Sequence, residues 1–355
     1  MNLTVRALFI PPILFTLASA DPPGTRLLTT IVLKHAPPFI VNDPTMACSP
    51  YRHSIEARAL AFLDGEPVAD SMYMGEGNYR PIQLTVPKLL RHDAEADVLW
   101  MTDQGLDSTV MQEWLLLPGT KPKHAAMVGR QVGRFLSSLR LETWAPSAEV
   151  CAWFTNPYNR ADEIMPRNAA TVARCLGEIG VDAVEIEELV RRYREAFEDA
   201  RDVEACLGMR DLWMGSVLVD GGGWASLVDW EMFGRSSASE ELGMLLGCIR
   251  GLMLNSSTTK SAKLAAEAFV KACLSVFVEE APEMCTPRFK RRMILCFVRE
   301  LGTTEDELDG EARLYMIRAV ASMLRAAGTG VEDMNLELIE PEERRFLQSV
   351  LKIDS

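Results

Sequence analysis

The chain is short of basic side chains. It has 37 lysines and arginines against 50 aspartates and glutamates, so its formal net charge is −13 at pH 7. This excess of negative charge argues against a nucleic-acid or anionic-membrane partner, although it suits a small cationic ligand. No stretch has the roughly twenty uninterrupted apolar residues that a membrane-spanning helix needs. We therefore expect a globular protein, and 355 residues are enough for two lobes with good cores.

Patterns of metal-binding cysteine and histidine are also missing. The eight cysteines are scattered and form no Cys-x-x-Cys pair, and the four histidines form no cluster, so no zinc site is expected. Cys273 and Cys296 lie in apolar helical runs, which is typical of small buried hydrophobic residues. Reduced thiols in the cytoplasm are the simplest interpretation.

The N-terminal segment offers a different interpretation of location. Arg6, the apolar run 7–17 and the small residues 18–20 resemble a secretory signal peptide, so residues 1–20 define a secreted alternative. Pro11 and Pro12 interrupt the apolar run and the positive region is thin, which favours the cytoplasmic interpretation.

Two acidic residues flank a predicted hairpin. Asp211 lies in the stretch Met-Arg-Asp-Leu-Trp-Met-Gly-Ser (209–216), and Asp229 in Leu-Val-Asp-Trp-Glu (227–231). Residues 217–219 and 224–228 are expected to be the two strands, joined by a turn over 220–223. Both carboxylates then lie at one end of a small ribbon. Phosphoryl transfer uses such a pair, because one carboxylate orients and deprotonates a hydroxyl and the other holds Mg²⁺ against the nucleotide phosphates.

This stretch resembles the catalytic and metal-binding loops of the aminoglycoside phosphotransferase and choline kinase family, which has a protein-kinase-like fold. That family typically has His-Gly-Asp-Leu-x-x-x-Asn, a hairpin and then Asp-Trp-Glu, and the spacings here match. The resemblance makes Asp211 the catalytic aspartate and Asp229 a metal ligand, with Ser216 in the place of the ligand asparagine. Met209 stands where the family has histidine. A serine hydroxyl is a suitable hard oxygen ligand, but it is shorter than an asparagine amide.

The upstream half supplies candidates for nucleotide binding. Lys34 ends a predicted β-branched strand over 29–36, and Glu56 lies beside the apolar stripe of a predicted helix over 51–63. In the family, such a lysine pairs with the α- and β-phosphates, and the glutamate fixes its orientation. The strand and turn over 98–105 resemble the hinge whose backbone groups bind adenine, which makes Met101 and Asp103 nucleotide-binding candidates. An ordinary buried strand and turn fits these residues equally well.

A glycine-rich loop over the phosphates is not found before Lys34. The family has a Gly-Gly-x-x-Asn run just before a strand such as 3–7, and Asn2 matches only the last position of that run. The chain either begins downstream of the loop of a longer protein or is a natural truncation. Residues 62–86 are expected to be loop and turn between the lysine–glutamate unit and the hinge strand.

The chain from residue 181 onward is mostly helical by its apolar period. Glu241, in Glu241-Leu242-Gly243, takes the place of the aspartate in the family's Asp-Leu-Gly. Helices are expected over 124–140, 237–254, 261–278, 287–301, 311–327 and 341–352.

These observations predict a two-lobed α+β, protein-kinase-like fold. Residues 1–103 would form an incomplete nucleotide-binding lobe, and residues 104–355 a mostly helical catalytic lobe. The resemblance implies ATP and Mg²⁺ as cofactors and a small-molecule hydroxyl as the phosphoryl acceptor. The negative net charge suits a cationic substrate. Met209, Ser216 and the missing loop favour one alternative, a catalytically impaired pseudokinase. The N-terminal pattern alone favours another, a secreted non-enzymatic domain.

Overall fold

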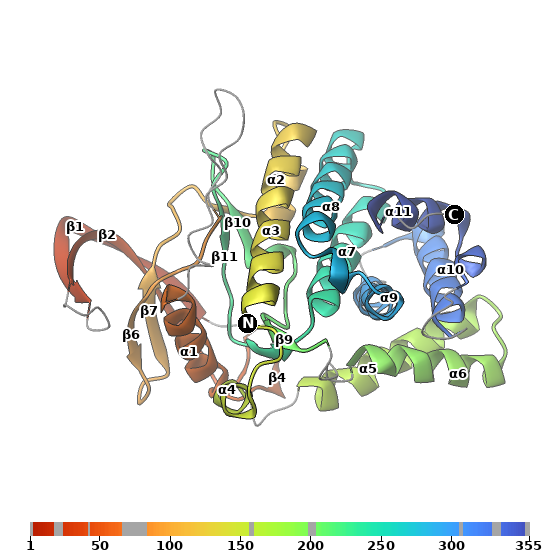
Figure 1. Cartoon of the computed structure of the whole chain (residues 1–355), viewed down its shortest axis with the longest axis horizontal. Helices are drawn as coiled ribbons and strands as arrows, with labels where there is room; N and C mark the ends of the chain where they lie inside the picture. Colours follow the sequence, from red (N-terminus) through yellow and green to blue (C-terminus); the bar gives the residue numbers. More distant parts are fainter. Residues whose placement is uncertain are drawn as a thin grey trace.

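A computed structural model describes residues 3–17, 24–41, 43–65, 84–155, 160–197, 204–304, 308–328 and 335–351. Strands gather toward the N-terminal half of the chain and helices toward the C-terminal half (Figure 1). None of the helices in these ranges is both long and apolar enough to cross a membrane.

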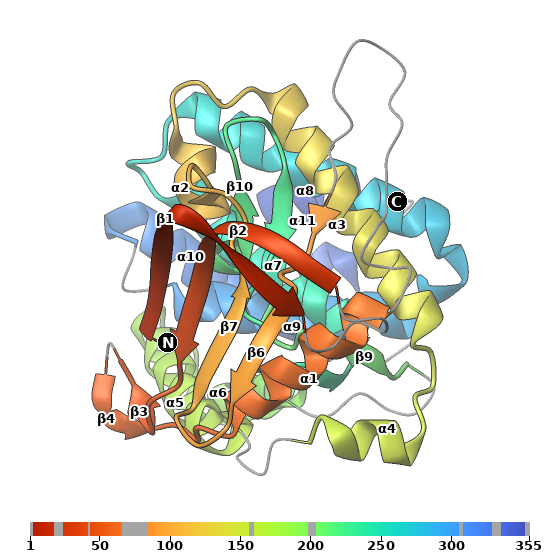
Figure 2. The same ribbon diagram turned by 90° about the vertical axis from the view of Figure 1, so that its left-hand side faces the viewer.

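The N-terminal half forms a four-stranded antiparallel sheet. Its strands are β1 (Leu3–Leu17), β2 (Gly24–His35), β6 (Leu89–Asp93) and β7 (Val98–Thr102), in the order β1-β2-β7-β6. Helix α1 (Arg52–Gly65) packs against β6 and β7, as Figures 1 and 2 show. The register sets Lys34 opposite Leu99, at the end of β2 that leads to α1. The predicted lysine strand, hinge strand and following helix are therefore confirmed as elements.

Strand β1 continues beyond the two prolines of the apolar run. Its pairing with β2 shifts register between Leu8 and Ile13, around Pro11 and Pro12. Proline has no N–H to donate to a ladder, so an irregularity is expected at this point of an edge strand. The run 7–17 that resembles a signal-peptide core is thus a strand of the sheet, and residues 18–20 lie outside the described ranges.

The prediction of a loop over residues 62–86 is wrong at both ends. Helix α1 extends to Gly65, and Leu84–Thr85 form the short strand β5, which pairs in parallel with β11 (Ala225–Leu227). A two-residue strand carries little signal in the sequence, because its partner β11 is remote in the chain. Residues 66–83 lie outside the described ranges.

The predicted hairpin is confirmed and lies inside a second sheet. Strands β10 (Val217–Val219) and β11 pair antiparallel, with Val217 opposite Leu227. With β5 and β8 (Thr109–Val110) they form the order β5-β11-β10-β8. A separate pair, β9 (Cys206–Gly208) and β12 (Gly234–Ser236), encloses this hairpin in the sequence. A further small pair, β3 (Phe39–Ile40) and β4 (Asp43–Ala47), precedes α1.

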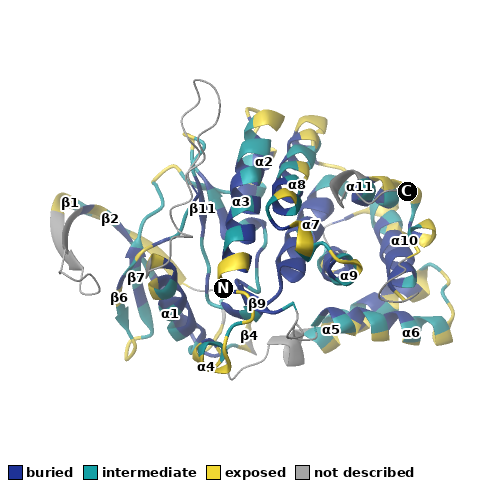
Figure 3. Ribbon diagram, in the orientation of Figure 1, coloured by how far each residue is buried: buried dark blue, intermediate teal, exposed yellow. Residues whose placement is uncertain are grey.

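Helices predominate in the chain after β8, and buried residues concentrate on the faces where the helices meet (Figure 3). Helices α3 and α8 pack closely at Gly129 and Gly133 of α3, which have no side chain. A Cβ at either position would lie 2.2 Å from a carbonyl oxygen of α8. The helices are α2 (Met111–Leu116), α3 (Pro122–Glu142), α4 (Ala148–Trp153), α5 (Arg160–Glu178), α6 (Ala183–Arg194), α7 (Ala238–Leu254), α8 (Lys260–Glu280), α9 (Pro287–Thr303), α10 (Gly310–Ala327) and α11 (Pro341–Leu351). The six predicted helices correspond to α3 and α7–α11. The division into lobes at residue 103 remains a prediction.

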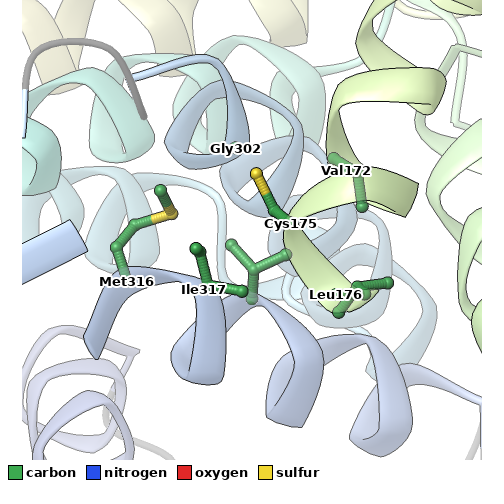
Figure 4. A pocket seen from close by; sticks show the side chains of 7 residues that line it. Val172, Cys175, Leu176, Gly302, Met316 and Ile317 are labelled. Atoms are coloured by element: carbon green, nitrogen blue, oxygen red, sulfur yellow. The ribbon is translucent and has the colours of Figure 1, made fainter. Parts of the chain in front are cut away.

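A small cavity lies among α5, α9 and α10 (Figure 4). Its lining is apolar, apart from the thiol of one cysteine: Val172, Cys175, Leu176, Gly302, Met316, Ile317 and Val320. This lining offers no group that pairs with phosphate and only one thiol, so we interpret the cavity as a packing feature of the helices.

Candidate active site

Lys34 is the centre of a buried cluster of charges. Its Nζ lies 2.5 Å from Glu56 Oε2 and 2.5 Å from Asp229 Oδ1, and 3.7 Å from Glu231 Oε2. Lys34 is 6% exposed and Glu56 is 1% exposed. The structure therefore brings together three of the predicted site residues, from β2, α1 and the turn after β11.

The charge state of this cluster follows from burial and from the neighbouring charges. Burial alone would lower the pKa of Lys34, but Asp229, Glu56 and Glu231 outweigh it and raise this pKa above its ordinary value. Burial raises the pKa of Glu56, although the ammonium of Lys34 opposes that change. Lys34 therefore remains a full cation, which is the form that can pair with phosphate oxygens.

Asp229 is directed at Lys34 by an unusual backbone turn. Its φ of +73° lies in the left-handed region, which is uncommon for residues other than glycine. The following residue, Trp230, is fully buried, and its amide N–H donates to Glu56 Oε1 at 3.3 Å. The Asp229 side chain is 34% exposed, so its carboxylate faces both Lys34 and the surface. Backbone strain of this kind clusters at functional sites.

Asp211 lies in a loop whose backbone is held from both sides. Arg210 has a φ of +60°, and its amide N–H donates to Glu241 Oε1 at 2.8 Å. The hydroxyl of Ser216 donates to the carbonyl oxygen of Asp211 at 2.9 Å. Asp211 itself is partly exposed, whereas Met209 is fully buried in the core. The methionine in the family's histidine position is therefore a packing residue.

Glu241 fixes this loop from the first turn of α7. Besides the N–H of Arg210, it accepts the Ser236 hydroxyl at 2.8 Å. A Cβ on Gly208 would lie 2.4 Å from Glu241 Oε1, which explains why no side chain stands there. Burial raises the pKa of Glu241 to about 7, although the N–H of Arg210 opposes that change. The longer glutamate thus reaches the backbone of the Asp211 loop.

Ser216 is fully buried, and its hydroxyl is engaged within the loop. It donates to the Asp211 carbonyl and accepts a long hydrogen bond of 3.4 Å from the N–H of Trp213. The structure therefore assigns Ser216 a part in holding the loop. Direct contact of Ser216 with a metal remains a prediction.

The family model described as "Phosphotransferase enzyme family" matches residues 36–277. The chain belongs to this family. The match includes Glu56, Asp211, Ser216 and Asp229, and Lys34 lies just before it. Together with the strand and helix arrangement, membership confirms the predicted two-lobed α+β, kinase-like fold.

Two relatives of this chain are called "4-hydroxytryptamine kinase". The protein of Psilocybe cyanescens is 27% identical over 229 residues, and that of Psilocybe cubensis is 25% identical over 230 residues. Each alignment covers 62% of this chain and 60% of the relative, so the chain spans about three fifths of their length.

Two solved structures align with most of this chain at low sequence identity. A choline/ethanolamine kinase family protein from Mesorhizobium loti has a TM-score of 0.42 and 14% identity, covering 96% of this chain and 92% of that protein. An ADP-bound aminoglycoside phosphotransferase has a TM-score of 0.41 and 13% identity, covering 88% and 92%.

The side chains of the two hinge candidates are already engaged with other parts of the protein. Met101 is 5% exposed and belongs to the core. The Asp103 carboxylate pairs with Arg6 of β1, whose Nε lies 2.8 Å from Asp103 Oδ2, and also accepts the N–H of Gly105 at 3.1 Å. Met101 is paired with Val32 of β2 and with Leu89 of β6, so its backbone groups face the neighbouring strands. Contact of Met101 and Asp103 with adenine remains a prediction.

Two residues of the site were not assigned from the sequence. Glu231 joins Glu56 and Asp229 in a group whose carboxylate oxygens lie within 4.8 Å of one another and could hold a metal ion. Its place two positions after Asp229, in the Asp-Trp-Glu triplet, was the available signal. Arg52, whose Nε lies 3.3 Å from Glu231 Oε2, had no such signal, because Glu231 is remote from it in the sequence.

Proposed function

We propose that this chain is an ATP-dependent phosphotransferase that phosphorylates a hydroxyl group of a small molecule, with Mg²⁺ as the metal. The observation that carries the proposal is the shared contact of Lys34 with Glu56 and Asp229. A buried, fully charged lysine beside a partly exposed aspartate offers one group for phosphate oxygens and one for a divalent cation.

The roles of the residues follow from their surroundings. Lys34 would bind nucleotide phosphates, and Glu56, which contacts it at 2.5 Å, would orient it. The carboxylates of Asp229 and Glu231 are hard oxygen ligands that suit Mg²⁺, and the bound ion would neutralise charge on the phosphates. Asp211, partly exposed on its braced loop, would orient the acceptor hydroxyl and take its proton. Met101 and Asp103 would contact adenine.

We propose a hydroxyl-bearing cationic amine as the substrate class. The two Psilocybe relatives are named for 4-hydroxytryptamine, and the net charge of −13 suits a cationic molecule. A cytoplasmic location fits the use of ATP, and the eight cysteines are free thiols.

The test is a phosphotransfer screen with Mg·ATP against 4-hydroxytryptamine, small cationic alcohols and sugars, on the protein with its native N-terminus. We expect turnover that Asp211→Asn abolishes while nucleotide affinity, measured by calorimetry, is unchanged. Nucleotide binding without turnover of any acceptor would favour the pseudokinase alternative. Absence of both would overturn the proposal.

A further inference from the structure

Arg52 is a buried arginine at the first position of α1. It is 1% exposed. Its Nη1 donates to the carbonyl oxygen of Ser49 and its Nη2 to that of Pro37, each at 3.0 Å. Because these carbonyls belong to the segment between β2 and α1, they fix the plane of the guanidinium before any other partner is considered.

The remaining nitrogen of the same guanidinium, Nε, faces Glu231. Arg52 Nε lies 3.3 Å from Glu231 Oε2, and the Glu231 side chain is only 12% exposed. The same oxygen lies 3.7 Å from Lys34 Nζ. Two cations from different elements therefore converge on one carboxylate oxygen.

The balance of charge shows why a second cation is needed. Glu56, Asp229 and Glu231 are three carboxylates in one group, and Lys34 alone lies among all three. If Lys34 turns toward phosphate oxygens, its ammonium contributes less positive charge beside the Glu231 carboxylate. The guanidinium of Arg52 is held by the two loop carbonyls, so its position beside Glu231 does not rest on a contact with Lys34.

From this geometry we propose that Arg52 is a positioning residue for the metal site: it holds the Glu231 carboxylate beside Asp229 so that the two can share a divalent cation. The proposal rests on the proposed function, because it assigns a role toward the metal of that reaction. The competing view is that Arg52 only joins α1 to the preceding segment. The two views differ in whether the effect of Arg52 requires Glu231.

A double-mutant cycle on Mn²⁺ affinity, measured by electron paramagnetic resonance in the presence of ADP, separates these views. We expect Arg52→Met to weaken Mn²⁺ binding by roughly tenfold or more, as removal of an outer-shell partner typically does. Glu231→Gln, which removes the charge of a ligand, should weaken it at least as much. The double variant should bind Mn²⁺ no more weakly than Glu231→Gln alone. Arg52→Lys keeps the cation but loses the fork geometry, so it should be intermediate.

Arg250→Met is the matched control. Arg250 is also buried, and its guanidinium pairs with Glu342 and Glu343 of α11, remote from the charge cluster in the sequence. This variant should lower the melting temperature and leave Mn²⁺ affinity unchanged. Arg52→Lys decides the question if Arg52→Met shows no cooperative thermal transition.

Two results would overturn the proposal. One is unchanged Mn²⁺ affinity in the folded Arg52 variants. The other is a double variant whose loss of Mn²⁺ affinity equals the product of the losses in the two single variants. A wild-type protein that binds neither ADP nor Mn·ADP would instead refute the proposed function, and the role of Arg52 would fall with it.

Discussion

Lys34 and Asp229 are 195 positions apart in the sequence, and their side chains meet at 2.5 Å. The same ammonium contacts Glu56, so β2, α1 and the turn after β11 are joined through one nitrogen atom. A change at any of these three residues therefore alters both the charge balance of the site and the packing of the elements that carry it.

We expect Lys34→Met to abolish detectable binding of Mg·ATP and also to destabilise the protein. Breaking a buried ion pair by removing one partner typically costs about 3–5 kcal/mol, because the remaining charge has no compensation. Lys34→Met/Glu56→Met replaces the two most buried members of the cluster by apolar groups. It should recover part of that stability without recovering nucleotide binding, because the Asp229 carboxylate that also loses Lys34 is 34% exposed and can be solvated. Urea denaturation and calorimetry measure the two effects separately. Wild-type nucleotide affinity in Lys34→Met would refute the phosphate role.

The sequence predicted the parts of the site that have local patterns. The spacing of Asp211, Ser216 and Asp229 around a glycine-rich turn is a property of one short segment, and the hairpin that it predicts is present. Lys34 ends a β-branched run before two prolines, which identifies a strand and its end.

The features that the sequence did not predict depend on remote partners. Strand β5 has two residues and exists because β11 offers it an edge. Arg52 reaches Glu231 from 179 positions away in the numbering, and neither residue carries a local sign of the other. The hydrogen bond from Ser216 to the Asp211 carbonyl depends on a tight turn over 214–216 that apolar periodicity does not encode.

Ser216→Ala tests whether the hydroxyl holds the loop or binds metal. Loss of the hydrogen bond to Asp211 should cost about 1 kcal/mol, so we expect kcat to fall roughly fivefold with Mn²⁺ affinity unchanged. Ser322→Ala is the matched control, because buried Ser322 also donates to a carbonyl (Ala319, 2.8 Å) and accepts a backbone N–H (Glu340, 3.1 Å). The control should lose similar stability and keep its kcat. A weakened Mn²⁺ affinity in Ser216→Ala would instead support direct ligation, and Ser216→Asn should then strengthen it.

Glu241 makes the stability of the Asp211 loop depend on pH. Its carboxyl titrates near 4.5 in the unfolded chain and near 7 in the folded protein, because burial disfavours the charged form. Between these values the folded state binds more protons than the unfolded state, so this group lowers the free energy of unfolding as pH rises from about 4.5 to about 7. The cost is absent below that window and complete above it.

Glu241→Gln removes this titration and keeps an oxygen that can accept the N–H of Arg210 and the hydroxyl of Ser236. We expect the free energy of unfolding of the variant, relative to wild type, to increase across pH 4.5–7 by an amount on the order of 3 kcal/mol. Glu241 Oε2 has no hydrogen-bond partner among the described residues, so the new amide adds an offset that does not vary with pH. Urea denaturation at a series of pH values measures the difference. Parallel stability profiles for the two proteins would show that Glu241 does not titrate in this range, and its hydrogen bond with the Arg210 amide would then be independent of pH between 4.5 and 7.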